Sequence, residues 1–557
     1  MAIGARIFFL VWIDEPILFF KYPYFAEKLA GGEDIGERLV DLSPFYLYFL
    51  TVLKKIFGVD WAFVKFIQSF LGALISLLIF AVGSRLFQKT AGLLAALIYA
   101  LYGNVIILES TLEPTVFIIF FNLLAIYFLL LSKDNFRSSS QSMALTLIGG
   151  FFVGLSIITK PNSLLFTPLG IGWLLFFPTG TLTVNRRLAQ ALIFCASALA
   201  LVAPVTIRNY VKLNDFVLVT ADAGKVFYHG SSKTATALDR GTLPDIDLII
   251  DGSTEPDIAH VLFRKAAGKL TGKAISPSES SHFWTQRTLS DIYDDPPKYI
   301  RRALKKVVFF FTDYEVHYIA SAFTEYKESR PFPFIRYGII ASLGVLGMLL
   351  ALKRFRQLFL VYGAIGVYLS ACLLFLVQSR YRTPAVPYLC LFAGSAICGL
   401  KEMIKDRRFK ALLLSLSACA VFFSLSHFAF RSEIAKQDRW QEATKRYYQM
   451  RARPSYNRGR YGEAIPELNR CLSIVPDFTP GLNLRGKAYA MLSRYEKAET
   501  DFKKVILLSP RSPQGYRNMG FLYLVQGEND KAKEYLTKAL ALAPNDKQVK
   551  ETLDVLR

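Results

Sequence analysis

Long apolar runs alternate with short polar connections along the first 430 residues of the chain. As α-helices, which rise about 1.5 Å per residue, these runs are long enough or nearly long enough to cross a hydrocarbon core of roughly 30 Å. They lie at about 62–84, 90–108, 114–132, 143–159, 163–178, 188–207, 333–352, 357–377, 384–400 and 411–430. The pattern predicts an all-α polytopic membrane protein.

The N-terminal apolar segment is shorter than the others. Residues 5–13 are too few to cross a bilayer, and no small-residue cleavage site of a signal peptide follows them. Two interpretations stay open: the true start lies upstream, or a tilted first helix continues past Asp14 to about Phe20. With this segment the sequence predicts about eleven spans.

The charges in the loops predict the orientation of the chain. One alternating set of short connections is basic throughout, whereas the other set contains few cations, and loop 105–113 contains none. The basic set comprises Arg85 and Lys89; Lys133 and Arg137; Arg186 and Arg187; Lys353, Arg354 and Arg356; and Lys401, Lys405, Arg407, Arg408 and Lys410. Because Lys and Arg favour cytoplasmic loops, we place segment 14–60, region 208–332 and everything after 431 on the outer face.

The C-terminal part has a different pattern, in which apolar and polar residues recur with helical spacing. Several residue types repeat every 34 positions, the period of tetratricopeptide repeats. The repeating residues are Pro476, Pro510 and Pro544; Ala464, Ala498 and Ala532; Gly486 and Gly520; and Tyr489 and Tyr523. We expect two clear repeats at about 477–510 and 511–544, a degenerate repeat with Pro454 in its first helix, and a capping helix after 544. Such a solenoid binds a protein or peptide partner on its concave face.

Composition narrows the class further. Hydrophobic residues make up 53% of the chain, and 66 Lys and Arg against 44 Asp and Glu give a net charge of +22. Because the cations gather in loops between spans, we read them as topology signals and expect no nucleic-acid partner. The six cysteines, five of them in apolar runs, have no metal-ligand spacing, so we predict no metal site. We predict no cofactor, and a requirement for a divalent metal ion stays an open alternative.

Three carboxylates are candidates for catalysis on the predicted outer face. Asp14 and Glu15 lie between two apolar stretches, and Glu113 comes just before a span that has Pro114 in its first turn. A carboxylate at the end of a span is costly to bury and is often retained for function. The alternatives are solvated surface groups and, for Glu113, a charge that complements the helix N-terminus.

Four basic residues stand at span ends on the same predicted face, against the general charge trend. They are Lys160, Arg208, Arg380 and Arg382, with Tyr381 between the last two. Arginine can bind phosphate with two parallel hydrogen bonds, and lipid phosphates lie at this depth. The alternative is that these side chains snorkel to the interface.

The order and spacing of several short motifs resemble the GT-C-fold glycosyltransferases of the protein-mannosyltransferase type (family 39-like), over about residues 14–400. The matching pieces are Tyr24-x-Ala26 to Gly32; Ser43-Pro44 to Phe57-Gly58; Gln68; Gly83-x-Arg85-Leu86-Phe87; Glu113; Gly154-Leu155 to Thr159-Lys160-Pro161; Pro204 to Arg208-Asn209-Tyr210; Gly224 to Gly230; Phe311-Thr312-Asp313-Tyr314-Glu315; and Arg380-Tyr381-Arg382-x-Pro384-x-x-Pro387. C-terminal tetratricopeptide repeats also occur in bacterial relatives.

The resemblance implies an inverting transfer of sugar from a polyprenyl-phosphate donor on the outer face. A carboxylate in the first outer loop would take the proton of the acceptor hydroxyl, and basic residues would stabilise the departing phosphate. Relatives carry an Asp six to eight residues before the position of Ala26, where this chain has Leu18, Phe19 and Phe20. Either Asp14 or, second, Glu15 takes that role through an insertion, or the chain has lost the base.

These observations predict a membrane glycosyltransferase domain over 1–430, with outer loops 14–60 and 208–332, and a repeat domain over 431–557. We expect a multi-pass protein of the cell inner (plasma) membrane, with the repeats periplasmic or extracellular. Predicted partners are a polyprenyl-phosphate-linked sugar, membrane lipid and a protein or peptide. The alternative is a catalytically inactive membrane scaffold that recruits partners through its repeats. A transporter would require inverted repeats, and region 208–332 has no counterpart.

Overall fold

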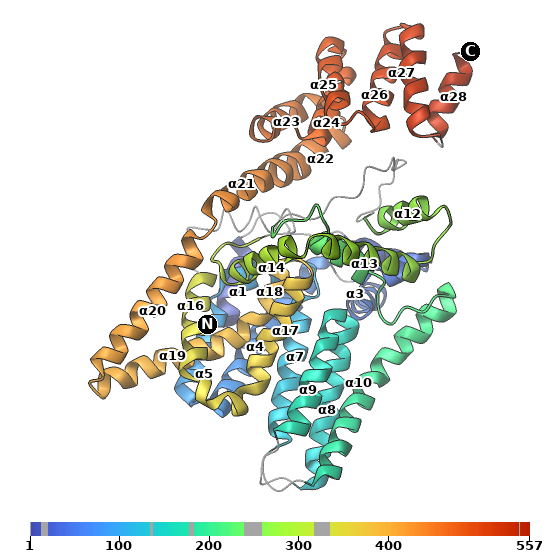
Figure 1. Ribbon diagram of the computed structural model, residues 1–557. Coiled ribbons are helices and arrows are strands. Elements are labelled where there is room, and N and C mark those ends of the chain that lie inside the picture. The colour runs from blue at the N-terminus through green and yellow to red at the C-terminus, as the bar shows by residue number, and fades with distance from the viewer. Residues whose placement is uncertain are drawn as a thin grey trace. The chain divides into compact units, whose positions relative to one another are not determined.

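The computed structural model describes residues 2–12, 21–58, 60–133, 138–177, 183–238, 259–316, 335–544 and 546–556. The chain divides into two compact units, coloured by residue number in Figure 1. The first, here called the membrane unit, comprises Met1–Thr242, Ala274–Tyr318 and Glu328–Ala429. The second, here called the repeat unit, comprises Leu243–Lys273, Ile319–Lys327 and Phe430–Arg557.

The described part of the membrane unit is built from helices. In chain order these are α1 (Ala2–Trp12), α2 (Lys21–Ala30), η1 (Gly36–Val40), α3 (Pro44–Phe57), α4 (Trp61–Leu86), α5 (Lys89–Ala100), α6 (Gly103–Glu109), α7 (Thr115–Leu131), α8 (Ser139–Thr159), η2 (Pro161–Leu165), α9 (Phe166–Phe176), α10 (Val184–Leu213), α11 (Ala223–Ser231), α13 (Pro277–Asp294), α14 (Pro296–Phe311), α16 (Tyr337–Leu350), η3 (Leu352–Arg354), α17 (Phe355–Leu374), α18 (Ser379–Arg382), η4 (Thr383–Ala385), α19 (Val386–Lys405) and α20 (Phe409–Phe428).

Each of the ten predicted apolar runs coincides with a helix or a helix pair, so the all-α membrane fold is confirmed. Among the described residues, six helical segments are long and apolar enough to cross a bilayer, and four shorter apolar helices accompany them. The six are Trp61–Leu86, Ser139–Thr159, Val184–Leu213, Leu352–Leu374, Ser379–Lys405 and Phe409–Phe428. The protein is therefore a multi-pass membrane protein; the exact number of spans stays a prediction.

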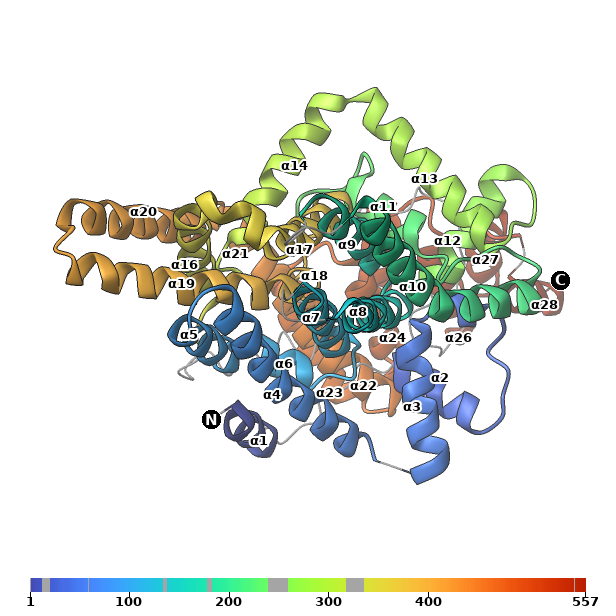
Figure 2. The ribbon, with the colours of Figure 1, turned by 90° about the horizontal axis from the view of Figure 1, so that it is seen from below.

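The apolar helices pack in a bundle, in which α8 lies against α7 and α10, and α19 lies against α16 and α5. Figure 2 looks along α7 and α8. Close approach depends on small residues. A Cβ atom added at Gly150 or Gly154 of α8 would collide with the backbone of α10 at Phe194 or Ala198. Small residues allow helix backbones in membranes to approach this closely, which is why α8 and α10 share a long seam.

Segment 14–60, which is predicted to lie on the outer face, contains α2, and this helix packs against α3. Its buried face includes Tyr22, Phe25 and Ala26. The helix ends at two glycines: the Gly31 amide donates to the Glu27 carbonyl at 2.9 Å, and Gly32 has a φ of +85° that favours glycine. The motif from Tyr24 to Gly32 therefore spans most of this helix and its end.

Region 208–332, the second predicted outer region, contains α14, whose buried cations attach it to neighbouring carbonyl groups. The Arg302 guanidinium donates to the carbonyls of Ser231, Ser232 and Ala235 at 2.6–2.7 Å. The Lys306 ammonium donates to three further carbonyls, two of them at the end of α17, at 2.8–2.9 Å. Burial lowers the pKa of Lys306 to about 7. These bonds fix α14 against α11 and α17.

The repeat unit contains the predicted helical pairs. Its described helices are α12 (Ala259–Thr271), α21 (Arg431–Gln441), a π-helical stretch (Glu442–Ala452), α22 (Arg453–Asn457), α23 (Tyr461–Ile474), α24 (Thr479–Met491), α25 (Tyr495–Leu508), α26 (Pro513–Val525), α27 (Asn529–Leu542) and α28 (Lys547–Val555). The 34-residue columns form its core: Ala498 and Ala532 are buried, and a Cβ on Gly486 would press on Phe502. The predicted first repeat pairs the stretch before α23 with α23 itself, and Pro454 lies in the first turn of α22 rather than inside a longer α-helix.

Candidate functional site

A carboxylate and an arginine from distant parts of the sequence meet at one end of the bundle. Glu113 lies in the turn between α6 and α7, and Arg380 lies in the short helix α18. Arg380 Nη1 donates to Glu113 Oε1 at 2.7 Å, and the Glu113 side chain is 3% exposed. Both residues were predicted as site residues, and the structure brings them together.

Lys160 and Tyr381 complete this group, here called the open cluster (Glu113, Lys160, Arg380 and Tyr381). The Lys160 ammonium lies 4.5 Å from the centre of the Tyr381 ring, and Arg380 Nη2 donates to the Tyr381 hydroxyl at 3.2 Å. Desolvation lowers the pKa of Lys160, which lies just after α8; the nearby charges of Tyr381, Glu113 and Asp222 oppose that shift, whereas Arg380 adds to it. Within the described residues, the Lys160 ammonium has no ion-pair or hydrogen-bond partner.

The start of α11 adds two charged residues that the sequence reasoning missed. Asp222 lies close enough to Lys160 to affect its pKa, and Asp222 pairs with Lys225 at 2.9 Å. The loop is held in place because the Ala221 amide donates to the Val40 carbonyl at 3.0 Å. The available signal was Gly224, where a Cβ would collide with the backbone of Ser281 on α13. That glycine fixes where α11 begins.

Two buried tyrosines, one from α2 and one from α3, lie close enough to Glu113 for its charge to affect their pKa. The rings of Tyr22 and Tyr46 are 5.0 Å apart and edge-on. The Tyr22 hydroxyl donates to Ser43 Oγ at 2.9 Å, and the Tyr46 hydroxyl donates to Gln68 Oε1 at 2.6 Å. Burial raises the pKa of Tyr22, and the negative charge of Glu113 raises it further. The motif residues Ser43 and Gln68 therefore support the wall beside Glu113.

Arg382 has different surroundings from Arg380. Its Nη2 pairs with Glu315 Oε2 at 2.9 Å, and its guanidinium also donates to the carbonyls of Phe309, Thr312 and Tyr314. Glu315 accepts further hydrogen bonds from Tyr102 and Ser379. We call Tyr102, Glu315, Ser379 and Arg382 the closed cluster. The predicted role of Arg382 in phosphate binding stays a prediction, and its geometry favours a role in holding segment 309–315.

The remaining predicted residues lie elsewhere. Arg208, near the end of α10, donates to the Tyr48 hydroxyl at 3.1 Å and to its neighbour Asn209, and within the described residues no hydrogen bond or ion pair joins it to the open cluster. Asp14 and Glu15 lie outside the described residues, so their predicted role as the base stays a prediction.

Glu109, the other acid of the same loop, forms a buried pair with the N-terminal helix. Arg6 of α1 donates Nε to Glu109 Oε2 at 2.6 Å and Nη2 to Oε1 at 3.0 Å. The carboxylate lies against Gly72 of α4, where no Cβ could be accommodated. The short first segment is thus anchored in the bundle, whichever interpretation of its length is correct.

No group of three or more His, Cys, Asp or Glu side chains that could hold a metal ion occurs among the described residues. The open cluster contains a single carboxylate together with two cations. Its composition suits an anion rather than a cation, because two positive groups converge on one small volume.

Comparison with known proteins gives a partial match. Residues 41–207 match the dolichyl-phosphate-mannose-protein mannosyltransferase family, and residues 480–512 and 513–546 match tetratricopeptide repeats. No curated protein sequence matches the chain significantly.

The solved structures that the comparison finds are distant from this chain. The apo oligosaccharyltransferase of Archaeoglobus fulgidus is 13% identical with a TM-score of 0.44, covering 81% of this chain and 58% of its own. The same enzyme with an inhibitory peptide and a dolichol-phosphate is 12% identical with a TM-score of 0.41, covering 82% and 59%. ArnT of Cupriavidus metallidurans bound to undecaprenyl phosphate is 12% identical with a TM-score of 0.34, covering 72% and 78%. This chain thus spans less than two thirds of the length of the oligosaccharyltransferase.

The family match begins in the turn before α3 and ends within α10, so it includes Glu113 and Lys160 of the open cluster but not Arg380. The two repeat matches coincide with the helical pairs α24–α25 and α26–α27, as the 34-residue period predicted. The resemblance inferred from the sequence motifs is therefore confirmed: the membrane unit is similar to the dolichyl-phosphate-mannose-protein mannosyltransferases, and the chain carries C-terminal tetratricopeptide repeats.

Proposed function

We propose that this protein is a membrane glycosyltransferase that moves a sugar from a polyprenyl-phosphate donor to an acceptor on the outer face of the membrane. The observation that carries the proposal is the open cluster, in which Lys160 and Arg380 lie together beside the buried carboxylate of Glu113. The family match over residues 41–207 supports the same class of reaction.

The cations would stabilise the leaving phosphate. As the bond between the anomeric carbon and the phosphate oxygen breaks, negative charge develops on the phosphate, and fixed positive groups lower the energy of that state. Lys160 suits this role because its ammonium has no anionic partner among the described residues. Glu113 would keep Arg380 oriented in the absence of donor, at a distance of 2.7 Å.

The base is assigned to the first outer segment. Asp14 is the first candidate and Glu15 the second; either carboxylate would take the proton of the acceptor hydroxyl while the oxygen attacks the anomeric carbon from the face opposite the phosphate. Glu113 would be a supporting carboxylate, because its pair with Arg380 occupies one of its oxygens. Inversion at the anomeric carbon follows from this single displacement.

The loop charges support a location in the cell inner membrane, with the repeat domain periplasmic or extracellular. On that side the repeats would recruit a protein or peptide partner close to the acceptor. Limited proteolysis of sealed inverted and right-side-out vesicles tests this arrangement. Cleavage of the repeats from the cytoplasmic side alone would overturn it.

The activity test is deletion of the gene followed by mass spectrometry of cell-envelope glycans and proteins. Loss of a sugar increment, restored by the wild-type chain, is the expected result. Asp14→Asn combined with Glu15→Gln should reach the membrane at wild-type level and fail to restore the increment. Unchanged masses in the deletion strain, or full restoration by the double variant, would contradict the proposal or the assigned base respectively. The first outcome would favour the non-catalytic scaffold.

A further inference from the structure

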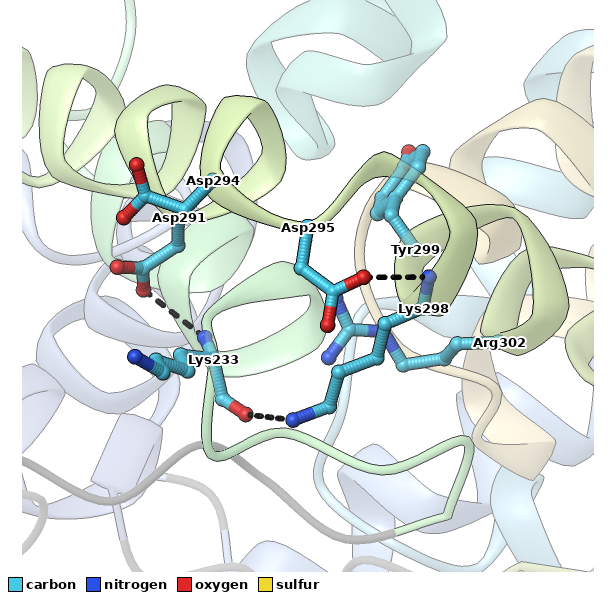
Figure 3. Close-up of a pocket in the computed structure, with 7 residues that line it drawn as sticks. All are labelled: Lys233, Asp291, Asp294, Asp295, Lys298, Tyr299 and Arg302. Atoms are coloured by element: carbon cyan, nitrogen blue, oxygen red, sulfur yellow. Dashed lines mark hydrogen bonds between the residues drawn. The ribbon is translucent and has the colours of Figure 1, made fainter.

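A separate pocket lies in the second outer region, at the junction of α13 and α14. It has a volume of about 210 Å³ and is drawn in Figure 3. Asp291 and Asp294 come from α13, and Tyr299 and Arg302 come from α14. Asp295, Lys298 and Lys233 complete the lining, the last from the loop after α11.

The backbone around this pocket is held by several hydrogen bonds. The Lys233 amide donates to Asp291 Oδ2 at 2.9 Å, and the Lys298 amide donates to Asp295 Oδ1 at 3.1 Å. Lys298 Nζ donates to the Lys233 carbonyl at 3.2 Å. Three segments are thus tied to one another around the pocket, so the pocket is built into the fold rather than formed by loose side chains.

Arg302 forms a buried part of the pocket wall. The residue is 8% exposed, and its two terminal nitrogens donate to carbonyls at the end of α11 and in the loop after it. These bonds hold the wall in place. Its Nε is shielded from solvent, so Arg302 shapes the pocket rather than offering this donor to a ligand.

The charges of the lining restrict the ligand chemistry. Three carboxylates and three cations line the pocket, so it has no excess of either sign. A phosphate would be repelled by the aspartates, and the carboxylates do not converge as a metal-binding group within the described residues. Carboxylates accept hydrogen bonds from hydroxyl groups, and lysine and arginine donate to them. A neutral ligand rich in hydroxyl groups can therefore bond to both the carboxylates and the cations of the lining.

Tyr299 and the small volume point to a single sugar ring. Tyr299 is the one aromatic side chain in the lining and could pack against the C–H face of such a ring. Pockets for drug-sized ligands usually have about 300–1,000 Å³, so 210 Å³ suits one ring rather than a long oligosaccharide.

We propose that this pocket is a carbohydrate subsite that holds one sugar unit of an acceptor glycan. The assignment of the sugar to an acceptor rests on the proposed function, whereas binding of carbohydrate itself does not. The subsite would keep the glycan on the outer region between successive encounters with the transfer site. Asp294 and Lys233 would contribute most to recognition, because their charged groups have no side-chain partners within the described residues.

Binding measurements on the purified full-length protein in nanodiscs test this inference. The probes are immobilised monosaccharides and disaccharides of hexoses and N-acetylhexosamines, read by biolayer interferometry. The wild-type protein should bind at least one probe, and both Asp294→Asn and Tyr299→Ala should weaken that binding at least tenfold. Tyr299→Phe keeps the ring and should bind within about threefold of wild type, which separates ring packing from loss of fold.

Two controls separate this inference from the proposed function. Glu113→Gln should lose sugar transfer and keep carbohydrate binding, and Asp530→Asn on α27 should affect neither. No binding to any probe, or equal binding by wild type, Asp294→Asn and Tyr299→Ala, would overturn the subsite while leaving the transfer proposal standing. Binding that disappears with Glu113→Gln instead would place the carbohydrate at the transfer site and would also overturn it.

Discussion

Arg380 and Arg382 are two residues apart in one short helix and have opposite surroundings. Arg382 is 1% exposed, and its guanidinium is shared by Glu315 and three backbone carbonyls. Arg380 pairs with Glu113 beside Lys160, a cation that has no counterion within the described residues. The closed cluster therefore holds backbone segments in place, whereas the open cluster has positive charge available for an anionic ligand.

The largest expected effect is on stability, in the closed cluster. Replacing Arg382 by Met leaves Glu315 buried without its cation and three carbonyls without a donor, which should cost about 3–5 kcal/mol. Thermal unfolding in detergent measures the loss. Combining Arg382→Met with Glu315→Gln removes the unpaired buried charge and should recover part of the lost stability. If Arg382→Met unfolds at the wild-type temperature and only loses sugar transfer, the division into closed and open clusters is wrong.

The next effect is on the reaction, in the open cluster. Lys160→Met should lower the transfer rate about 10²–10³-fold, the usual cost of losing one group that stabilises developing negative charge. The unfolding temperature should stay near that of wild type, since the ammonium makes no hydrogen bond within the described residues. Lys410→Met on α20, at an exposed lysine, is the matched control and should transfer normally. Comparable transfer by both variants would remove Lys160 from the site.

The lowered pKa of Lys160 gives the open cluster a pH dependence. Because desolvation lowers this pKa, the ammonium loses its proton at a lower pH than an ordinary lysine does, and transfer should decline on the alkaline side. Lys160→Arg stays protonated throughout that range. The Lys160→Arg variant should therefore keep its activity to a higher pH than wild type does, even where the maximal rate of the variant is lower. Identical alkaline limbs would show that another group titrates.

A third ion pair, between Arg6 and Glu109, should contribute to stability in the way that the closed cluster does. Gly72→Ala places a methyl group against the Glu109 carboxylate and should destabilise the protein by about 1–3 kcal/mol. Gly366→Ala in α17 is the control, because a Cβ there meets no atom within 4 Å. The Gly366→Ala variant should be as stable as wild type or slightly more stable. Equal unfolding temperatures for the two variants would argue against tight docking of α1.

The smallest effect is expected at Arg208, which contacts Tyr48 and Asn209 rather than the open cluster. Arg208→Ala should cost at most about 1 kcal/mol, or about fivefold in kcat/KM. Steady-state kinetics with a polyprenyl-phosphate sugar measure this. A loss as large as that of Lys160→Met would return Arg208 to the phosphate site predicted from the sequence.

The fold could be read from the sequence because its signals are repetitive. The apolar runs predicted the bundle helices, and a 34-residue period predicted the repeats, since each repeat must bury the same face against its neighbour. The sequence singled out four titratable residues at or near span ends, and these four meet in the structure: Glu113, Lys160, Arg380 and Tyr381. Their position at the ends of apolar helices drew attention to them, but the same criterion also selected Arg208 and Arg382, which lie outside the open cluster.

Other parts of the site depend on tertiary contacts that a sequence does not display. Arg380 and Arg382 look alike in the motif, and only the path of segment 309–315 distinguishes them. The proximity of Asp222 to Lys160 depends on the loop before α11, which a backbone hydrogen bond joins to Val40. The pocket proposed to hold a sugar combines α13, α14 and the loop after α11, which carry no shared motif.

Photo-crosslinking with a benzophenone-tagged polyprenyl monophosphate tests the central claim most directly. The purified protein in nanodiscs should be labelled, undecaprenyl phosphate should compete, and Lys160→Met and Arg380→Met should each reduce labelling at least tenfold while Lys410→Met does not. Labelling that is equal in all four proteins would contradict the assignment of the open cluster to the donor phosphate.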